Sequence, residues 1–197
     1  MIGRLAFVIV VCVLASLGAG CAATPPSHFY TLRATATPVT TASSLSLAVG
    51  PVSVPAVVDR PEIVVTAGPN QVWLDEFNRW ASPLQDNLSR VIAENLAAVM
   101  GTPHVTQFPQ ALNTGADYRV AIEVLRFEST PGEAAMLDAV WTVRRTQDGK
   151  TETRRTTARE AVREKGYDAL AAAHSRAAAR LSQDIADEVR ALDHPAQ

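Results

Sequence analysis

Hydrophobic residues alternate with polar or small residues over several stretches of the chain, which is the pattern of half-buried β-strands. Residues 45–54 form the first such stretch, and Gly50-Pro51 interrupts it, as expected of a strand with a bulge. Ile63–Val65 and Val72–Leu74 flank Gly68-Pro69-Asn70, a sequence that predicts a hairpin turn. The first part of the chain is therefore expected to form strands.

Alternation returns later in the chain, at Tyr118–Phe127, Leu137–Val143 and Thr151–Glu160. Asp148-Gly149 is a preferred sequence for a two-residue type I′ turn, so we expect the last two of these strands to form a tight hairpin. Such a turn places Arg145 opposite Glu152, which is a favourable cross-strand pair.

Two segments carry apolar residues at the spacing of an amphipathic helix. The first starts at Ser82, which can cap the helix, with Pro83 at the first helical position, Gln85 completing a capping box and Gly101 as the stop. Its apolar stripe consists of Leu84, Leu88, Val91, Ile92, Leu96 and Val99. The second helix covers Tyr167–Leu192, with a stripe of Leu170, Ala173, Ala177, Leu181, Ile185 and Val189.

The order of these elements is strands, helix, strands, helix. Two amphipathic helices on one face of a mainly antiparallel sheet would bury every apolar stripe that the sequence presents. The sequence therefore predicts a two-layer domain of the α+β class.

The first 20 residues differ from the rest and predict a lipoprotein signal peptide. Arg4 supplies a positive charge, and the apolar run Leu5–Leu17 is shorter than the ~20 residues that a membrane-spanning helix needs. Leu17–Cys21 resembles a bacterial lipoprotein processing site, although the leucine stands one position further from the cysteine than usual. Several acyl chains on Cys21 would attach the protein durably to a membrane. The alternative is a soluble periplasmic protein with a spare cysteine.

We divide the rest of the chain by composition. Residues 21–28 are expected to be a lipidated tether, residues 29–192 one domain and residues 193–197 a tail. Within the domain, Phe29–Leu32 can form a small strand. Arg33–Ser44 is rich in threonine, alanine and serine without an apolar period, and predicts a loop.

Composition and charge exclude several classes of protein. The chain has 197 residues, 47% of them hydrophobic and 19% charged, with a formal net charge of -2. This length fits one domain, and the near-neutral charge argues against a nucleic-acid-binding protein. The two cysteines, Cys12 in the signal and Cys21, cannot build a disulfide framework or a multi-thiolate zinc site.

The sequence contains no motif of a catalytic site, a cofactor site or a metal site. Its histidines are scattered and none has ligand spacing: His28, His104, His174 and His194. Glu123 and Asp138 belong to neighbouring predicted strands and could converge as an acid–base pair, although solvation of a strand face is the simpler interpretation. We therefore expect a protein that is not an enzyme and that binds no cofactor.

Basic residues gather around the last predicted hairpin, chiefly Arg144, Arg145, Arg154 and Arg155. One interpretation is a solvated sheet face with cross-strand ion pairs. The other is a basic patch that faces anionic lipid or an acidic partner, since each basic residue near such a surface contributes ~1 kcal/mol.

Two short segments stand out from their surroundings. Residues 55–61 end in the charged turn Asp59-Arg60-Pro61, and Arg79-Trp80 precedes Pro83 at the start of the first helix. An aromatic residue and prolines at element boundaries usually pack, so Trp80 would hold the helix entry against the sheet and Pro61 would fix the turn.

These segments, in this order after Cys21, resemble the ABC-type transport auxiliary lipoprotein family, which includes paraquat-inducible protein C. The matching residues are Tyr30-Thr31-Leu32, Val58-Asp59-Arg60-Pro61-Glu62-Ile63-Val64 and Arg79-Trp80-Ala81-Ser82-Pro83-Leu84. Ser82 stands where the family pattern has an acidic residue, which puts an acidic partner contact at this position in doubt. The resemblance extends over Tyr30–Leu192.

The resemblance implies a non-catalytic subunit of a lipid transport system that contains an ABC ATPase, a permease and MCE-domain proteins. Such a subunit would anchor or receive the MCE assembly at the outer membrane, and self-association would suit a ring-shaped partner. Ala22 is not the aspartate that retains lipoproteins at the inner membrane, which agrees with the outer membrane. The alternative is a structural or assembly lipoprotein of the envelope without a role in transport.

Overall fold

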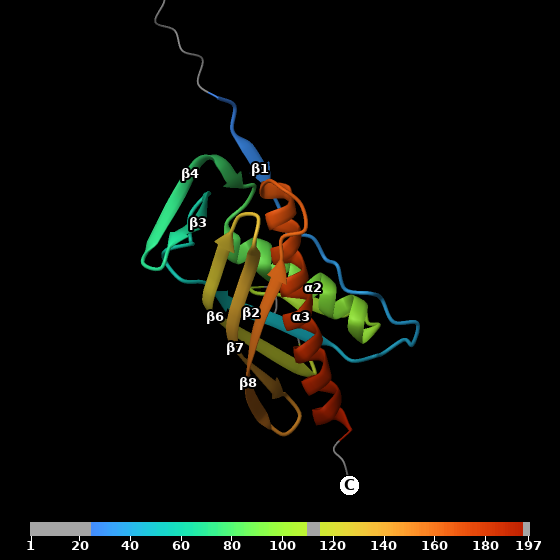
Figure 1. Ribbon diagram of the computed structural model, residues 1–197. Coiled ribbons are helices and arrows are strands. Elements are labelled where there is room, and N and C mark those ends of the chain that lie inside the picture. The colour runs from blue at the N-terminus through green and yellow to red at the C-terminus, as the bar shows by residue number, and fades with distance from the viewer. Residues whose placement is uncertain (1–24, 110–114, 195–197) are drawn as a thin grey trace, which may run out of the picture.

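The computed structural model describes residues 25–109 and 115–194 (Figure 1). In chain order the elements are β1 (His28–Tyr30), β2 (Leu47–Ser53), β3 (Glu62–Gly68), β4 (Gln71–Trp80), α2 (Leu84–Met100), β5 (Val105–Gln107), β6 (Tyr118–Thr130), β7 (Ala134–Arg145), β8 (Thr151–Ala161) and α3 (Tyr167–Asp193). The predicted signal peptide and Cys21 lie outside the described residues.

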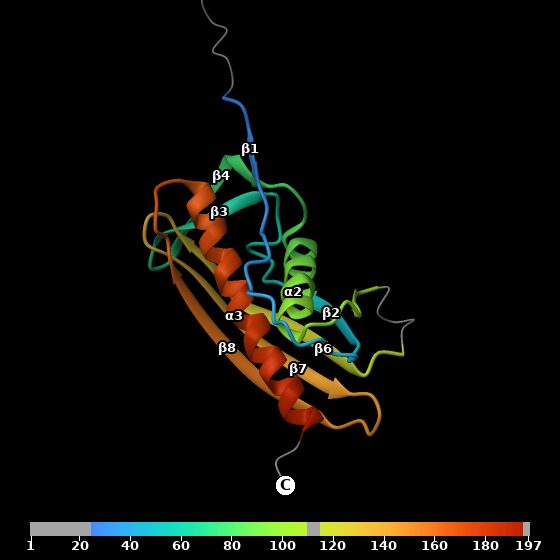
Figure 2. The ribbon, with the colours of Figure 1, turned by 90° about the vertical axis from the view of Figure 1, so that its right-hand side faces the viewer.

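The larger sheet has the strand order β5-β2-β6-β7-β8. β6, β7 and β8 are antiparallel to one another, whereas β2 pairs in parallel with both β5 and β6. Both helices lie on one face of this sheet: α3 packs on β7 and β8, and α2 packs on β2 (Figure 2). The predicted two-layer α+β arrangement is confirmed.

The remaining strands form a second, smaller sheet of order β1-β4-β3, which the sequence did not separate from the first. β3 and β4 are the predicted hairpin, and β1 adds to β4 in parallel. Strand periodicity indicates which residues are buried but carries no information on which strand is the neighbour. The prediction of a single sheet was therefore too simple.

The apolar stripes of both helices are buried as predicted. Every stripe residue of α2 and of α3 named above belongs to the continuous hydrophobic core between the helices and the sheets. Gly101 ends α2 in a left-handed conformation with φ +65°, and a Cβ at this position would lie 2.1 Å from the carbonyl oxygen of Thr41. Glycine is therefore required here both for the backbone and for the close approach of the preceding loop.

The start of α2 differs from the prediction. Pro83 is the N-cap residue rather than the first helical residue, and no side chain caps the helix. Ser82 is exposed and makes no capping hydrogen bond. The entry of α2 is instead fixed by packing, because Leu84 and Leu88 are fully buried.

The β7–β8 hairpin also differs. The N–H of Arg145 donates to the carbonyl oxygen of Lys150 over 2.8 Å, so four residues form the turn instead of two. Glu152 lies opposite Val143, not opposite Arg145. Arg145 pairs within the turn with Asp148, at 2.6 Å. The N–H of Gly149 donates to the carbonyl oxygen of Arg145 over 3.0 Å and closes this wider turn. An aspartate–glycine pair is compatible with such a turn.

Candidate docking site

The two segments singled out in the sequence meet at one corner of the smaller sheet. Glu62 at the start of β3 pairs with Arg79 near the end of β4, and their side chains form an ion pair at 2.6 Å. The N–H of Trp80 donates to the carbonyl oxygen of Pro61 over 2.7 Å. The antiparallel hairpin thus brings Asp59-Arg60-Pro61 beside the residues that lead into α2.

A surface cavity of about 400 Å³ lies at this corner. Its lining comes from the two segments: Asp59, Arg60, Pro61, Trp80, Ala81, Ser82 and Pro83. All of the predicted motif residues except Arg79 therefore line one cavity, and Arg79 lies behind it in the ion pair with Glu62. The carboxyl of Glu62 has a lowered pKa because it accepts hydrogen bonds from its own backbone N–H and from Arg79.

Trp80 connects the cavity to the core. Only 5% of its surface is exposed, and its ring meets Phe127 and His174 edge to face, with centroid distances of 6.1 Å and 6.3 Å. The predicted packing role of Trp80 is thus observed. Because the indole is held on the inner side, the cavity has a rigid aromatic wall beside an exposed charged turn.

The segment that follows β1 passes next to this corner. The N–H of Ala81 donates to the carbonyl oxygen of Tyr30 over 2.8 Å, and the Tyr30 hydroxyl donates to Asn78 at 2.8 Å. Tyr167 at the start of α3 donates to Asp75 over 2.6 Å, and burial together with this carboxylate raises the pKa of the Tyr167 phenol. β1, β4 and α3 are therefore tied together where the chain enters the domain.

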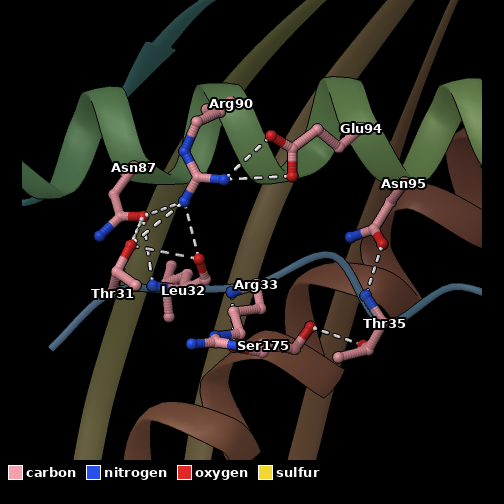
Figure 3. Close-up of polar contacts among 9 residues, drawn as sticks. All are labelled: Thr31, Leu32, Arg33, Thr35, Asn87, Arg90, Glu94, Asn95 and Ser175. Carbon is pink, nitrogen blue, oxygen red and sulfur yellow. Dashed lines mark hydrogen bonds and ion pairs between the residues drawn. The ribbon is translucent and has the colours of Figure 1, made fainter.

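Beyond Tyr30 the chain runs between α2 and α3 as an extended strap, residues 31–36 (Figures 2 and 3). On α2, the Asn87 side-chain oxygen accepts from the N–H of Leu32 at 3.2 Å, and Asn95 accepts from the N–H groups of Thr35 and Ala36 at 3.0 Å each. Sequence reasoning missed both asparagines, although polar residues in an otherwise apolar helix stripe are a signal of buried hydrogen bonding.

Two further side chains, those of Arg90 and Ser175, bind the backbone of the strap. Arg90 donates to the carbonyl oxygen of Leu32 at 2.7 Å and forms an ion pair with Glu94 (Figure 3). From α3, Ser175 accepts from the N–H of Arg33 at 3.1 Å. Side chains of α2 and α3 therefore take the place of the backbone partners that the strap would have found in a sheet.

The basic residues of the last hairpin do not share one face. Successive residues of a strand point to opposite sides. Arg154 lies on the helix side, where it meets Glu188 of α3 at 3.2 Å, while Arg155 lies on the open face and binds both oxygens of Asp138. Arg145 bonds toward α3 at the Leu192 carbonyl oxygen, and Arg144 is exposed. The clustered arginines of the sequence thus divide between the two faces of the sheet.

The considered acid–base pair is not arranged for proton transfer. Asp138 is 2% exposed, and its oxygens accept from Arg155 at 2.8 Å and 2.6 Å. These hydrogen bonds lower the pKa of Asp138, which is therefore ionised and fully engaged. Glu123 is exposed on the adjacent strand, opposite Val140.

The histidines remain scattered in the structure. His174 is buried, stacks on Phe127 at 3.8 Å between centroids and hydrogen-bonds Ser129 at 2.8 Å. Burial lowers its pKa to about 3, so it is neutral in the folded protein. Within residues 25–109 and 115–194, no group of three or more His, Cys, Asp or Glu side chains is placed to hold a metal ion. In the same residues neither helix is long and apolar enough to cross a membrane.

The structure is thus a two-layer α+β domain with an exposed cavity that two short sequence segments line. Residues 30–186 match the family model of the ABC-type transport auxiliary lipoprotein component. The chain belongs to this family, as the resemblance in its motifs indicated. It is accordingly a lipoprotein-family accessory component of ABC-type transport.

Solved structures share the fold. A crystal structure of an uncharacterized protein superimposes with a TM-score of 0.70 at 22% identity, over 84% of this chain and 99% of that one. Protein XCC0632 from Xanthomonas campestris, of the DUF330 family, gives a TM-score of 0.68 at 22% identity, over 83% and 94% of the two chains. No curated protein matches the sequence.

Proposed function

We propose that this chain is a non-catalytic accessory subunit of an MCE/ABC-type intermembrane lipid transport system. In this role it docks the periplasmic MCE assembly at the outer membrane, to which acylated Cys21 attaches it. Membership of the transport auxiliary family supports the transport role. The observation that carries the docking proposal is that residues from two of the segments that resemble the family, 58–64 and 79–84, line one cavity.

The cavity suits a protein partner. Asp59, Pro61 and Ser82 are exposed, so they can meet a partner, whereas Trp80 forms an ordered wall behind them. Binding energy at protein interfaces concentrates where an aromatic residue backs a pocket with a polar rim. The opposite charges of Asp59 and Arg60 would orient the partner rather than attract it over a distance.

The position of the cavity agrees with an anchor at Cys21. Tyr30 lies beside Ala81, which lines the cavity. The tether from Cys21 to His28 can span at most about 25 Å when fully extended. The proposed anchor would therefore hold the cavity near the membrane surface, where an assembly that reaches across the periplasm would end. Several copies around such an assembly would form a homo-oligomer.

The test is capture of partners from native membranes with the mature, lipidated protein. We expect an MCE-domain protein with the wild type, loss of this partner with Arg60→Glu and retention with Arg180→Glu, a matched exposed arginine on α3. Failure of the wild type to recover any MCE-domain protein would contradict the transport role. Equal capture by both variants would leave the role standing and exclude the cavity as its docking site.

The alternative is a structural or assembly lipoprotein of the envelope. The genes next to this one distinguish the two, since the transport role requires an ATPase, a permease and an MCE protein to be encoded together. Absence of these three would favour the alternative.

A further inference from the structure

The indole N–H of Trp80 is a hydrogen-bond donor without an acceptor. Trp80 is 5% exposed and lines the cavity, and its N–H has no acceptor in the part of the chain that the structure describes and is not sealed from solvent. A buried tryptophan usually places this group on a partner. Trp141 does so, since its N–H donates to Thr156 at 3.0 Å. The N–H of Trp80 is therefore left for water or a ligand.

Arg60 brings a positive charge to the same cavity. Whereas Arg145, Arg154 and Arg155 of the last hairpin are ion-paired, Arg60 forms no ion pair with any described residue. Its Nε is buried and has no hydrogen-bond partner. A buried donor of this kind is costly unless an acceptor is supplied, and a charged acceptor is the strongest.

The other arginine of this corner is already engaged. The carboxylate of Glu62 senses the charge of Arg60, but it is bonded to Arg79 at 2.6 Å. Arg79 is not part of the cavity lining. The guanidinium that remains for a ligand of the cavity is therefore that of Arg60.

The amino end of α2 also lies at the cavity. Pro83 is both the N-cap residue of α2 and part of the lining. The hydrogen-bond ladder of the helix starts with the N–H of Asn87, which donates to the carbonyl oxygen of Pro83, and no side chain caps the N–H groups before it. Free N–H groups and the helix dipole favour a negative charge at this end. The helix thus agrees with the ligand that Trp80 and Arg60 indicate, an anion.

The acidic residues nearby limit the charge of that anion. Asp59 lines the cavity and is exposed, whereas Asp86, in the first turn of α2, is not part of the lining. The cavity therefore combines one unpaired cation with one carboxylate of its own, which disfavours a phosphate group with a charge near -2. A carboxylate carries a single charge, and its two oxygens can accept from two separate donors.

Ser82 makes the cavity of this chain more suitable for an anion. The family pattern has an acidic residue at this position, where a second carboxylate would repel a negatively charged ligand. The hydroxyl of Ser82 lines the cavity instead and can donate a hydrogen bond.

The rest of the lining is apolar and exposed. Pro61, Ala81 and Pro83 are exposed, and the indole of Trp80 lies behind them. The volume of about 400 Å³ suits one or two side chains rather than a folded element. Because exposed residues from both segments surround the cavity, a partner chain can pass over it and place one side chain inside. Apolar neighbours of that side chain would lie on the two prolines.

We propose that the cavity binds the side-chain carboxylate of an aspartate or glutamate of the docking partner. Arg60 and the indole N–H of Trp80 donate to the carboxylate, and the amino end of α2 adds to its stabilisation. Asp59 restricts the site to a single negative charge. This inference deepens the proposed function and rests on it for the identity of the partner.

The probe is a short peptide of alanine and valine with one central glutamate and both ends blocked; the control peptide carries glutamine instead. Heteronuclear NMR on the mature protein follows the indole N–H of Trp80. We expect a saturable shift of this signal with the glutamate peptide and an affinity at least about tenfold lower for the glutamine peptide. The indole signals of Trp73 and Trp141, which do not line the cavity, should stay unchanged.

Two variants test the assigned residues. Arg60→Gln should weaken binding of the glutamate peptide at least about tenfold, whereas Arg180→Gln, at an exposed arginine of α3 outside the cavity, should not change it. Asp59→Asn should tighten binding about threefold, because it removes an opposing charge. A merely structural role of this turn would not produce tighter binding. If Arg60→Gln fails to fold, as circular dichroism would show, Asp59→Asn and the two peptides still decide.

The proposal is overturned by equal binding of the two peptides or by unchanged binding to folded Arg60→Gln. It is also overturned if inorganic phosphate, or the glutamine peptide with a free C-terminal carboxylate, binds more tightly than the glutamate peptide. Partner capture separates this proposal from the transport role. Capture of an MCE-domain protein equally by wild type and Arg60→Gln would reject the carboxylate site and leave the transport role standing. Peptide binding without capture of any MCE-domain protein would reject the transport role alone.

Discussion

The N–H of Trp80 hydrogen-bonds the carbonyl oxygen of Pro61 over 2.7 Å, and this bond joins the two sequence segments that line the cavity. The residues around this bond differ in their exposure. Trp80 belongs to the core, whereas Asp59 and Ser82 face solvent. Substitutions at this corner should therefore divide into those that change stability and those that change only binding.

Trp80→Ala should lower the free energy of unfolding by about 3–5 kcal/mol, because it leaves a cavity beside Phe127 and His174. Asp59→Ala, on the exposed turn, should change it by less than about 0.5 kcal/mol. Urea denaturation of both variants measures the difference. A stable Trp80→Ala protein would show that the indole does not hold α2 and the sheets together.

Asn95→Ala should cost about 1–3 kcal/mol, since it removes the buried acceptor of two partly buried hydrogen bonds, from the N–H groups of Thr35 and Ala36. Glu94→Ala is the matched control on the same helix: its side chain is 46% exposed in an ion pair with Arg90, so the change should be within about 0.5 kcal/mol. Chemical denaturation of the two variants tests this. Equal effects would mean that the strap contributes little to stability.

Stability should fall in acid because of His174. Its folded pKa of about 3 lies below the ordinary value of 6.5, so below pH 6.5 the unfolded chain binds a proton that the folded protein excludes. The free energy of unfolding therefore decreases as the pH falls from about 6.5 toward 3, by up to about 1.4 kcal/mol per pH unit from this group.

His174→Gln isolates that contribution, because glutamine keeps a hydrogen-bonding group near Ser129 and does not titrate. Denaturation at pH 7.5, 6 and 5 should show the wild type losing stability relative to the variant at each lower pH. A constant difference between the two proteins would mean that folding does not lower the pKa of His174.

Cys21→Ala should release the protein from membranes, because the acyl chains on Cys21 are the proposed attachment. Fractionation of cells that express each form, with immunodetection of the membrane and soluble fractions, measures this. Retention of the variant in the membrane fraction would refute attachment through Cys21. Replacing Cys12, within the predicted signal peptide, should leave membrane attachment unchanged.

The sequence alone determined most of the local structure of this protein, but not the cap of α2 or the width of the β7–β8 turn. The stripe from Leu84 to Val99, the turn at Gly68-Pro69-Asn70 and the stop at Gly101 were predicted because each depends on neighbours within a few residues. The motifs at Tyr30–Leu32, Val58–Val64 and Arg79–Leu84 indicated the family. The cavity that residues of the last two motifs line was not predicted. The sequence also predicted that Trp80 packs, since an aromatic residue before a helix start usually does.

Only the tertiary structure decided which segments meet. The second sheet, the parallel pairing of β2 with β6 and the strap held by Asn87 and Asn95 depend on contacts between residues far apart in sequence. The division of the arginines between two faces depends on strand register, and the edge position of β8 depends on strand order. A local pattern predicts that a residue is buried or that a strand forms. Packing of the whole chain decides which strand lies next to which, because strands of similar pattern can pair in many orders.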